Sequence, residues 1–275
     1  MTISARTKLI ALFGDPVSHS LSPALHNSWI EALGLDAAYV ALRIGEKEAD
    51  AAFASLAAFG FHGANVTVPH KARAARAAQR PAPAVVALGA ANTLLWEEGG
   101  VAAFNTDAQG AVDALDDAAS GWREGVKSAL IVGAGGAAKA VAFGLRAAGV
   151  SRISVVNRTR ARAAEIEGAD IADWAAMDAA FADADLIVQT TTLGMKGQPP
   201  GAWPIAAAKG TAIVMDAVYA PLETPLLKAA RMRGLQSLDG LGMLLFQAAR
   251  AFEIWFGVKP DIALGRKILE RSAGG

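Results

Sequence analysis

Short runs of strand-forming residues alternate with longer helical patterns along nearly the whole chain of 275 residues. In the first part, the predicted strands 9–13, 38–43 and 64–68 are each followed by a predicted helix, at 23–33, 49–59 and 71–79. This alternation is typical of βαβ units, in which helices cover the faces of a mostly parallel sheet. The sequence therefore predicts an α/β fold.

A second series of the same kind occupies the middle of the chain. It contains predicted strands at 129–132, 153–156, 186–189 and 212–216, and predicted helices at 135–148, 161–167 and 224–233. All of these strands can lie parallel, so this part is expected to be a doubly wound, Rossmann-like domain. A predicted strand pair at 90–96 and 101–104 and a helix at 107–119 join the two series.

The last part of the chain shows two helical patterns, at 241–256 and 261–272, and no strand pattern. We expect these helices to return to the first domain and cover its sheet. The predicted organisation is therefore an N-terminal α/β domain formed by residues 1–106 with 241–275, and a second domain formed by residues 107–240.

Composition excludes several classes of function. The 26 basic residues balance the 26 acidic ones, so the chain lacks the excess positive charge typical of proteins that bind nucleic acid or anionic membranes. The absence of cysteine excludes disulfides, thiolate metal sites and a cysteine nucleophile. The four histidines show no ligand spacing with acids, and we expect no metal site. The apolar run 9–13 is shorter than the roughly 7–15 residues of a secretory signal, which favours a cytoplasmic protein.

A glycine-rich turn lies between a predicted strand and a predicted helix of the second series. The strand 128–132 runs into Gly133, Ala134, Gly135, Gly136, Ala137 and Ala138, which is a GxGxxA pattern in the context that a dinucleotide site requires. Gly133 permits the tight turn, and Gly135 lets backbone amides approach a pyrophosphate at the start of the helix. A glycine-rich turn without a ligand is the alternative.

The end of the next predicted strand indicates which dinucleotide binds. An NAD site carries an acidic residue here for the ribose hydroxyl, but this chain has Asn157, Arg158, Thr159, Arg160 and, further on, Arg162. A guanidinium group suits a ribose phosphate. The predicted cofactor is therefore NADP(H), and a solvated basic helix start is the alternative.

Polar side chains follow the predicted strands of the first domain. The candidates are Ser20 and Ser22 after the first strand, Asn65, Thr67 and Lys71 around the third, Asn92 before the strand pair, and Asp107 after it. Open α/β sheets bind ligands at the carboxyl ends of their strands, and such hydroxyl and amide groups suit a polyol or a carboxylate. Each residue also has a plainer interpretation: Ser22 and Asp107 could cap helices, and Lys71 could lie on the surface.

Seven motifs in order make the chain resemble the shikimate dehydrogenase family from about residue 11 to 257. They are Ser20-Leu-Ser-Pro23, Asn65-Val-Thr-Val-Pro-His-Lys71, Gly89-Ala-Ala-Asn-Thr93, Asn105-Thr-Asp107, the loop Gly133–Ala137, Asn157-Arg-Thr159 and Asp239-Gly-Leu-Gly-Met243. The resemblance implies a Rossmann-like NADP(H) domain beside a substrate domain. It also implies reduction of 3-dehydroshikimate to shikimate, a step toward chorismate and the aromatic amino acids.

The resemblance assigns roles to individual residues. It implies that the substrate's carboxylate and hydroxyls are held by Ser20, Ser22, Asn65, Thr67, Asn92, Tyr219 and Gln247. Lys71 would donate and accept the proton at the reacting oxygen, with Asp107 beside it. The nucleotide would contact Gly133, Ala134, Gly135, Gly136, Ala137, Asn157, Arg158, Thr159 and Arg162, and its nicotinamide would contact Ala217, Gly240 and Met243.

Two alternatives to this function stay open. A quinate or mixed quinate/shikimate dehydrogenase differs by one substrate hydroxyl, which a sequence does not resolve. A catalytically silent NADP(H)-binding regulator could use the same scaffold, although such a protein has no need of both Lys71 and Asp107. The expected partner is a small molecule, not nucleic acid or a membrane, and the chain is expected to be a monomer or a homodimer.

Overall fold

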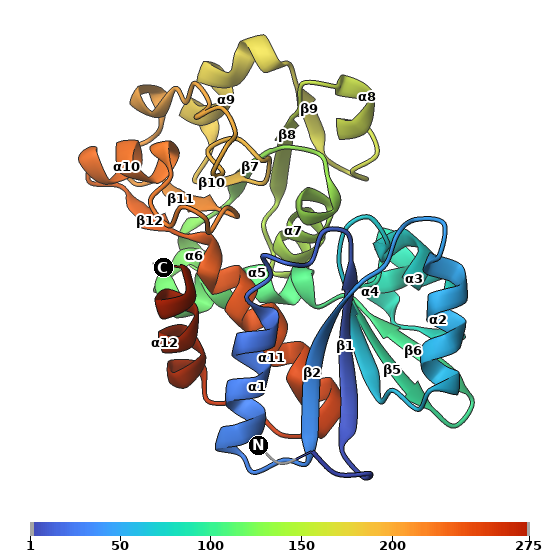
Figure 1. The fold of residues 1–275 in the computed structure, drawn as a ribbon. Coiled ribbons are helices and arrows are strands. Elements are labelled where there is room, and N and C mark those ends of the chain that lie inside the picture. Colours follow the sequence, from blue (N-terminus) through green and yellow to red (C-terminus); the bar gives the residue numbers. More distant parts are fainter. Residues whose placement is uncertain (1–2, 274–275) are drawn as a thin grey trace. The chain divides into compact units, whose positions relative to one another are not determined.

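The computed structural model describes residues 3–273, which form two compact units (Figure 1). The first unit comprises Met1–Thr106 and Gln247–Gly275, and the second comprises Asp107–Phe246. The second unit thus extends to Phe246 instead of ending at residue 240. The reason is that Met243 belongs to its buried core and Phe246 packs against that core.

The first unit is built on a mixed sheet that has six strands in the described residues, in the order β2-β1-β3-β5-β6-β4. These are β1 (Lys8–Gly14), β2 (Ala37–Arg43), β3 (Gly63–Val66), β4 (Arg80–Pro81), β5 (Thr93–Glu97) and β6 (Gly100–Phe104). β1 is parallel to β2 and β3, whereas β5 is antiparallel to β3 and β6. The ends of β1, β3 and β6 therefore lie at the same edge as the start of β5.

Helices cover both faces of this sheet (Figure 1). They are α1 (Ser22–Ala32), α2 (Ala49–Ala58), α3 (Lys71–Ala77), α4 (Pro83–Leu88), α12 (Ile262–Ala273) and the last part of α11 (Gly240–Phe256). On one face, Phe53 of α2 and Ala74 of α3 join a core with Phe13. On the other face α12 packs on α1, where Trp29 Nε1 donates to Asp261 O at 2.7 Å. The predicted return of the C-terminal helices to the first domain is confirmed.

The second unit contains a parallel sheet with six strands among residues 3–273, in the order β12-β11-β10-β7-β8-β9. These are β7 (Ser128–Val132), β8 (Arg152–Val156), β9 (Asp170–Ala172), β10 (Leu186–Gln189), β11 (Ile213–Asp216) and β12 (Gln236–Leu238). Its helices are α5 (Thr106–Ala118), α6 (Trp122–Gly125), α7 (Gly136–Ala147), α8 (Arg160–Ala163), η1 (Trp174–Ala176), α9 (Met177–Asp183), η2 (Ile205–Ala207), α10 (Pro225–Met232) and the start of α11.

Alternate residues of β7 enter two separate cores. Ala129 and Ile131 pack in the core that contains α7 residues, whereas Leu130 and Val132 pack in the core that contains α9 and α10 residues. A strand that is buried on both faces has helices on both sides. The Rossmann-like, doubly wound architecture and the α/β fold class that the sequence predicts are therefore confirmed.

The second unit differs from the expected elements in two ways: in elements that were not expected and in one helix that ends early. The strands β9 and β12 and the short helices α6, η1, α9 and η2 are not in the pattern read from the sequence, and the helix expected at 161–167 ends as α8 at Ala163. Beyond Ala163 the amides of Glu165 and Ile166 bond three residues back instead of four, which tightens the chain before Gly168. Among the described residues, no helix combines the length and the apolarity that crossing a membrane requires.

Candidate active site

Two serines follow β1 in the first unit. Ser20 lies in the loop, and its Oγ accepts a hydrogen bond from the Ser22 backbone N–H at 3.2 Å. Ser22 is the first residue of α1 and is buried. The residue that caps α1 is Leu21, with no side-chain bond to the helix. The plainer interpretation of Ser22 as a helix cap is therefore wrong.

Thr67 and Lys71 follow β3, which is the parallel neighbour of β1. A Cβ on Gly14 would overlap Thr67 Cγ2, so the threonine side chain lies over the end of β1. Lys71 is the half-buried first residue of α3. Its carbonyl accepts a hydrogen bond from Ala91 N at 2.9 Å, which fixes the backbone of Lys71 beside the segment that carries Asn92.

Asn92 is the centre of a buried hydrogen-bond network at this edge of the sheet. Its Nδ2 donates to Thr106 Oγ1 at 2.9 Å and, more weakly, to Gln247 Oε1 at 3.4 Å. Its Oδ1 accepts from Thr106 N at 2.8 Å. Asn92 therefore fixes the residue that directly precedes Asp107, and it also contacts a proposed substrate residue in α11.

The first unit thus brings one set of the predicted residues to a single edge of its sheet. They are Ser20, Ser22, Asn65, Thr67, Lys71, Asn92 and Gln247. Because β5 runs antiparallel to β3, its start meets the end of β3 at the pair Asn65 and Thr93. Asp107 and Tyr219 belong to the second unit; Asp107 is buried in the first turn of α5.

The glycine-rich turn of the second unit leaves space for a ligand. Gly133 has a φ of 115°, and a Cβ there would press on Thr190 Oγ1. Gly135 and Gly136 are exposed, and a Cβ on either would meet no atom within 4 Å. α7 begins at Gly136, so its first backbone amides have no acceptor within the helix and can bind an anionic group.

The arginines after β8 do not share one environment. Arg158 is exposed and, within residues 3–273, forms no ion pair or hydrogen bond. Arg160 forms an ion pair with Asp173. Arg162 is exposed, and its charge contributes to the lowered pKa of Glu165, whose main cause is the hydrogen bond from Lys139. Arg158 and Arg162 are therefore exposed and form no ion pair in the described part of the chain, whereas Arg160 is paired. Asn157 closes this turn by donating from Nδ2 to Thr159 O at 2.8 Å.

The residues expected at the nicotinamide belong to two segments that meet in the second unit. A Cβ on Gly240 would overlap the carbonyl of Ala217, and Gly240 N donates to Val218 O at 3.3 Å. Only glycine permits this approach. Met243 is 8% exposed and lies in the core. Tyr219 follows Val218, is half-buried, and has its pKa raised by burial.

Sequence reasoning missed a buried network that shapes this loop. Asp216 accepts hydrogen bonds from Gln189 Nε2 at 3.2 Å, Val218 N at 2.9 Å and Thr224 Oγ1 at 2.7 Å. Burial raises the pKa of the Asp216 carboxyl, and these hydrogen bonds oppose that shift. The only signal in the sequence is a polar residue at the end of each of two apolar strands, β10 and β11.

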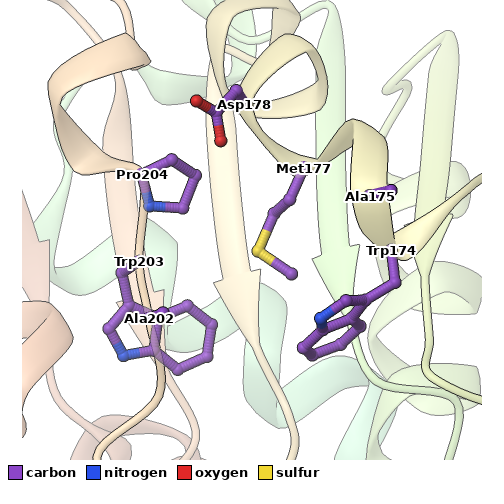
Figure 2. Close-up of a pocket in the computed structure, with 7 residues that line it drawn as sticks. All are labelled: Trp174, Ala175, Met177, Asp178, Ala202, Trp203 and Pro204. Atoms are coloured by element: carbon purple, nitrogen blue, oxygen red, sulfur yellow. The ribbon is translucent and has the colours of Figure 1, made fainter.

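A pocket of about 430 Å³ lies elsewhere on the second unit (Figure 2). Its lining consists of Trp174, Ala175, Met177, Asp178, Ala202, Trp203 and Pro204. Figure 2 shows the two indole rings on either side of Met177, with the carboxylate of Asp178 at one end. None of the predicted site residues lines this pocket, so the candidate site is defined by the hydrogen-bonded side chains described above.

Family models match three parts of the chain. Residues 12–94 match the shikimate dehydrogenase substrate binding domain, 120–194 match shikimate / quinate 5-dehydrogenase, and 240–270 match the shikimate 5'-dehydrogenase C-terminal domain. The NADP(+) shikimate dehydrogenase of Azorhizobium caulinodans is 44% identical over 267 residues, which are 95% of this chain and 95% of that protein. The chain belongs to the shikimate dehydrogenase family.

Solved structures of this family and its neighbours share the fold. The shikimate 5-dehydrogenase of Thermus thermophilus, solved with NADP(H) and shikimate, has a TM-score of 0.88 at 35% identity. It covers 97% of this chain and 100% of its own. Quinate dehydrogenase of Corynebacterium glutamicum, solved with NAD, has a TM-score of 0.89 at 28% identity, with 96% and 99% covered. The predicted family is therefore confirmed.

Proposed function

We propose that this chain catalyses the reversible, NADPH-dependent reduction of 3-dehydroshikimate to shikimate, a step of the shikimate pathway. Membership of a family whose relatives are NADP-dependent shikimate dehydrogenases supports this function. The observation that carries it is the edge of the first sheet, where Ser20, Ser22, Lys71 and Asn92 offer a polar, partly buried surface to a polyol carboxylate.

The glycine turn and the basic residues of the second unit fit the cofactor. The open space at Gly135 and Gly136 suits a pyrophosphate, and exposed Arg158 suits a ribose phosphate. When bound, NADPH supplies a hydride to the ketone carbon. We assign the other contacts to Ala134, Ala137, Asn157, Thr159 and Arg162, and those with the nicotinamide to Ala217, Gly240 and Met243.

The substrate is held by neutral polar groups. The serine hydroxyls can donate to the carboxylate, and the Ser22 N–H fixes the Ser20 oxygen. Thr67, Asn92, Tyr219 and Gln247 are assigned to the ring hydroxyls. Asn65 supports this set indirectly, because its side-chain amide donates to Asn92 O and Thr93 Oγ1 inside the protein.

Lys71 is the residue that we assign to proton transfer. Reduction of a ketone needs a proton at the oxygen as the carbon is reduced, and a cationic amine can both donate it and stabilise the developing negative charge. In the reverse reaction Lys71 removes that proton. Asp107, whose neighbour Thr106 is held by Asn92, is assigned to hydrogen-bond the same hydroxyl and to orient it.

The test is the absorbance at 340 nm with shikimate or quinate as substrate and NADP or NAD as acceptor, in all four combinations. We expect turnover with shikimate and NADP and much weaker signals in the other three. Comparable turnover of quinate or NAD would make the chain a broader polyol dehydrogenase. Four flat traces with detectable NADPH binding would instead indicate a silent regulator. The cytoplasmic location and the monomeric or homodimeric state stay predictions.

A further inference from the structure

Asp216 is a buried acidic residue that the proposed reaction does not use directly. It ends β11 and is 0% exposed, and the two side chains that donate to it, Gln189 and Thr224, are 0% and 1% exposed. Its three donors are neutral groups, and within residues 3–273 its carboxylate forms no ion pair. Burial of a charge without a counter-ion costs stability, so this acid has to be explained by what its oxygens hold.

The two carboxylate oxygens hold both ends of one loop. Oδ1 accepts from Val218 N at 2.9 Å, and Oδ2 accepts from Thr224 Oγ1 at 2.7 Å. Thr224 is also the residue that caps α10, where its Oγ1 accepts from Leu227 N at 3.3 Å. The loop 217–224, which carries Tyr219, is therefore tied at its start and at its end to a single side chain of the sheet.

Val218 is held from two sides. Its N–H donates to Asp216, and its carbonyl accepts from Gly240 N at 3.3 Å. Directly before it, Ala217 N donates to Gln189 O at 2.8 Å, and the Gln189 side chain donates from Nε2 to Asp216 Oδ1 at 3.2 Å. The same carboxylate thus fixes Val218 and the side chain of the residue whose carbonyl holds Ala217.

We propose that Asp216 is a positioning residue for hydride transfer: its carboxylate fixes the backbone of Ala217 and Tyr219, which are assigned to the nicotinamide and to a substrate hydroxyl. The inference rests on the proposed function, which makes these assignments. Hydride transfer depends on alignment, and a misplacement of about 1 Å can cost roughly 100-fold in rate. Asp216 touches neither ligand in this assignment and acts through Val218 and Thr224.

The test compares Asp216→Val and Asp216→Asn with the wild type in shikimate oxidation. Asp216→Val removes every acceptor at similar size, whereas Asp216→Asn keeps one acceptor oxygen for Val218 N and has an amide that can donate to Thr224 Oγ1. We expect kcat to fall roughly 100-fold in Asp216→Val and less than about tenfold in Asp216→Asn. Equal losses in both variants would mean that the charge matters and not the position of the loop, which would overturn the inference.

A binding measurement tests whether the rest of the nucleotide site is intact. Adenosine 2′,5′-bisphosphate is a part of NADP that lacks the nicotinamide, and the hydrogen bonds of Asp216 reach neither Arg158 nor the glycine turn. We expect its Kd, measured by titration calorimetry, to change less than about twofold in Asp216→Val. A loss of binding as large as the loss of kcat would mean that the variant disturbs the whole site, and the inference would be overturned.

A matched control separates positioning from general destabilisation. Asp185 also accepts three hydrogen bonds, from Lys127 N, Ser128 N and Lys209 Nζ, at the opposite end of the strands of the same sheet. We expect Asp185→Val to lower the melting temperature and to keep the kcat of the wild type at temperatures where it is folded. If it lowers kcat as much as Asp216→Val does, the loss reflects destabilisation and Asp216 is structural.

A second pair of variants carries the same test if Asp216→Val does not fold. Thr224→Val keeps the shape of the side chain and removes the donor to Oδ2, whereas Thr224→Ser keeps the hydroxyl. We expect kcat to fall about tenfold in Thr224→Val and to return in Thr224→Ser, and a wild-type kcat in both would overturn the inference. A wild-type protein that oxidises no shikimate overturns the proposed function itself, whereas an active wild type with an unaffected Asp216→Val variant overturns only the inference.

Discussion

Lys71 is the single side chain whose removal tests the proposed chemistry most directly. A group that acts mainly in the transition state lowers kcat more than it changes KM when it is deleted. We expect Lys71→Ala to lower kcat for shikimate oxidation about 100-fold or more, with KM for shikimate changed only modestly. Steady-state kinetics with NADP as acceptor measure both quantities.

Lys259→Ala is the control for the loss of a positive charge, because Lys259 is exposed in the turn between α11 and α12. We expect its kinetics to match those of the wild type. An effect of Lys71→Ala that is confined to KM would mean that Lys71 only binds the substrate.

Two arginines in the same turn provide a matched pair for cofactor choice. Arg158 is exposed, whereas Arg160 is paired with Asp173. Loss of a charge-assisted contact to phosphate costs about 1.5–3 kcal/mol, so Arg158→Ala should raise KM for NADP at least tenfold and leave KM for NAD unchanged. Arg160→Ala should have a smaller effect on either cofactor. Equal losses for NADP and NAD in Arg158→Ala would refute a contact with the ribose phosphate.

Stability should depend on pH through His26. It is fully buried, its ring nitrogens have no partner in the described part of the chain, and burial lowers its pKa to about 3. The unfolded chain binds this proton near its ordinary pKa of 6.5, so the stabilising contribution is complete above pH 6.5 and is lost as the pH falls toward 3. We expect the free energy of unfolding to fall by about 1 kcal/mol per pH unit below 6.5.

Urea unfolding of the wild type and His26→Phe between pH 7 and pH 5 measures this contribution. In His26→Phe, the fall in the free energy of unfolding with decreasing pH that His26 causes should disappear. His19→Asn, which changes an exposed histidine, should show the same fall as the wild type. Identical slopes in the wild type and His26→Phe would assign the pH dependence to other groups.

The residues of the site differ in how far the sequence predicts them. Ser22, Lys71 and Asn92 stand in family motifs at strand ends, where a ligand is expected. Tyr39, whose hydroxyl donates to Asn65 Oδ1, stands in the middle of a strand, where an aromatic residue is ordinary. Its partner Asn65 is 26 residues away, and only the pairing of β1 with both β2 and β3 brings the two together.

At the scale of elements, Asp185 ties the start of β10 to the start of β7. Its carboxylate accepts from Lys127 N at 3.0 Å, Ser128 N at 2.9 Å and Lys209 Nζ at 2.6 Å. Hydrogen bonds to a charged group contribute about 1.5–3 kcal/mol. We expect Asp185→Asn to lower the free energy of unfolding by about 2 kcal/mol at neutral pH, measured by denaturant titration, and Asp178→Asn, an exposed control, to have little effect.

The pH dependence of this difference has a definite sign. Burial alone raises the pKa of Asp185, but the hydrogen bonds from Lys209, Ser128 and Lys127 outweigh it and lower the pKa well below the ordinary 3.8. The stabilisation is therefore complete above pH 3.8 and is lost as the pH falls further. The gap between wild type and Asp185→Asn should shrink only in that acidic range, and a gap that shrinks already at pH 6 would contradict this.

Long, periodic elements are predicted well from this sequence, and short edge strands are not. The central strand β7 and the helix α7 carry strong apolar patterns because both are buried. β9 and β12 have three residues each and lie at the two edges of the second sheet, where one side of the ladder is unpaired. Asp170 and Gln236 give them a polar start, so the sequence pattern there resembles a loop.

At the scale of the whole molecule, each ligand should protect its own unit. We expect shikimate to slow amide hydrogen exchange around residues 20–22, 65–71 and 92, and NADP to slow it around 133–138 and 157–162. Bound ligands stabilise the states that bind them and suppress local opening. Hydrogen exchange with mass spectrometry, with each ligand alone, measures both patterns.

A ligand without matching chemistry is the control for this experiment. Glycerol at the same concentration has hydroxyls but no carboxylate, and it should protect neither set of residues. Protection by shikimate that is confined to 133–162 would place the substrate on the wrong unit and contradict the assignment.

The second unit is one continuous segment, whereas the first is made of two. Thr106, the last residue before the segment, and Gln247, the first after it, both bond to Nδ2 of Asn92, at 2.9 Å and 3.4 Å. The two cut ends of the first unit therefore lie within the reach of one amide group. In engineering terms, residues 107–246 are a domain inserted into the first unit, and the two residues that flank the insertion, Thr106 and Gln247, already lie close together. A linker of a few residues could replace the inserted domain, and one asparagine would then bridge the junction.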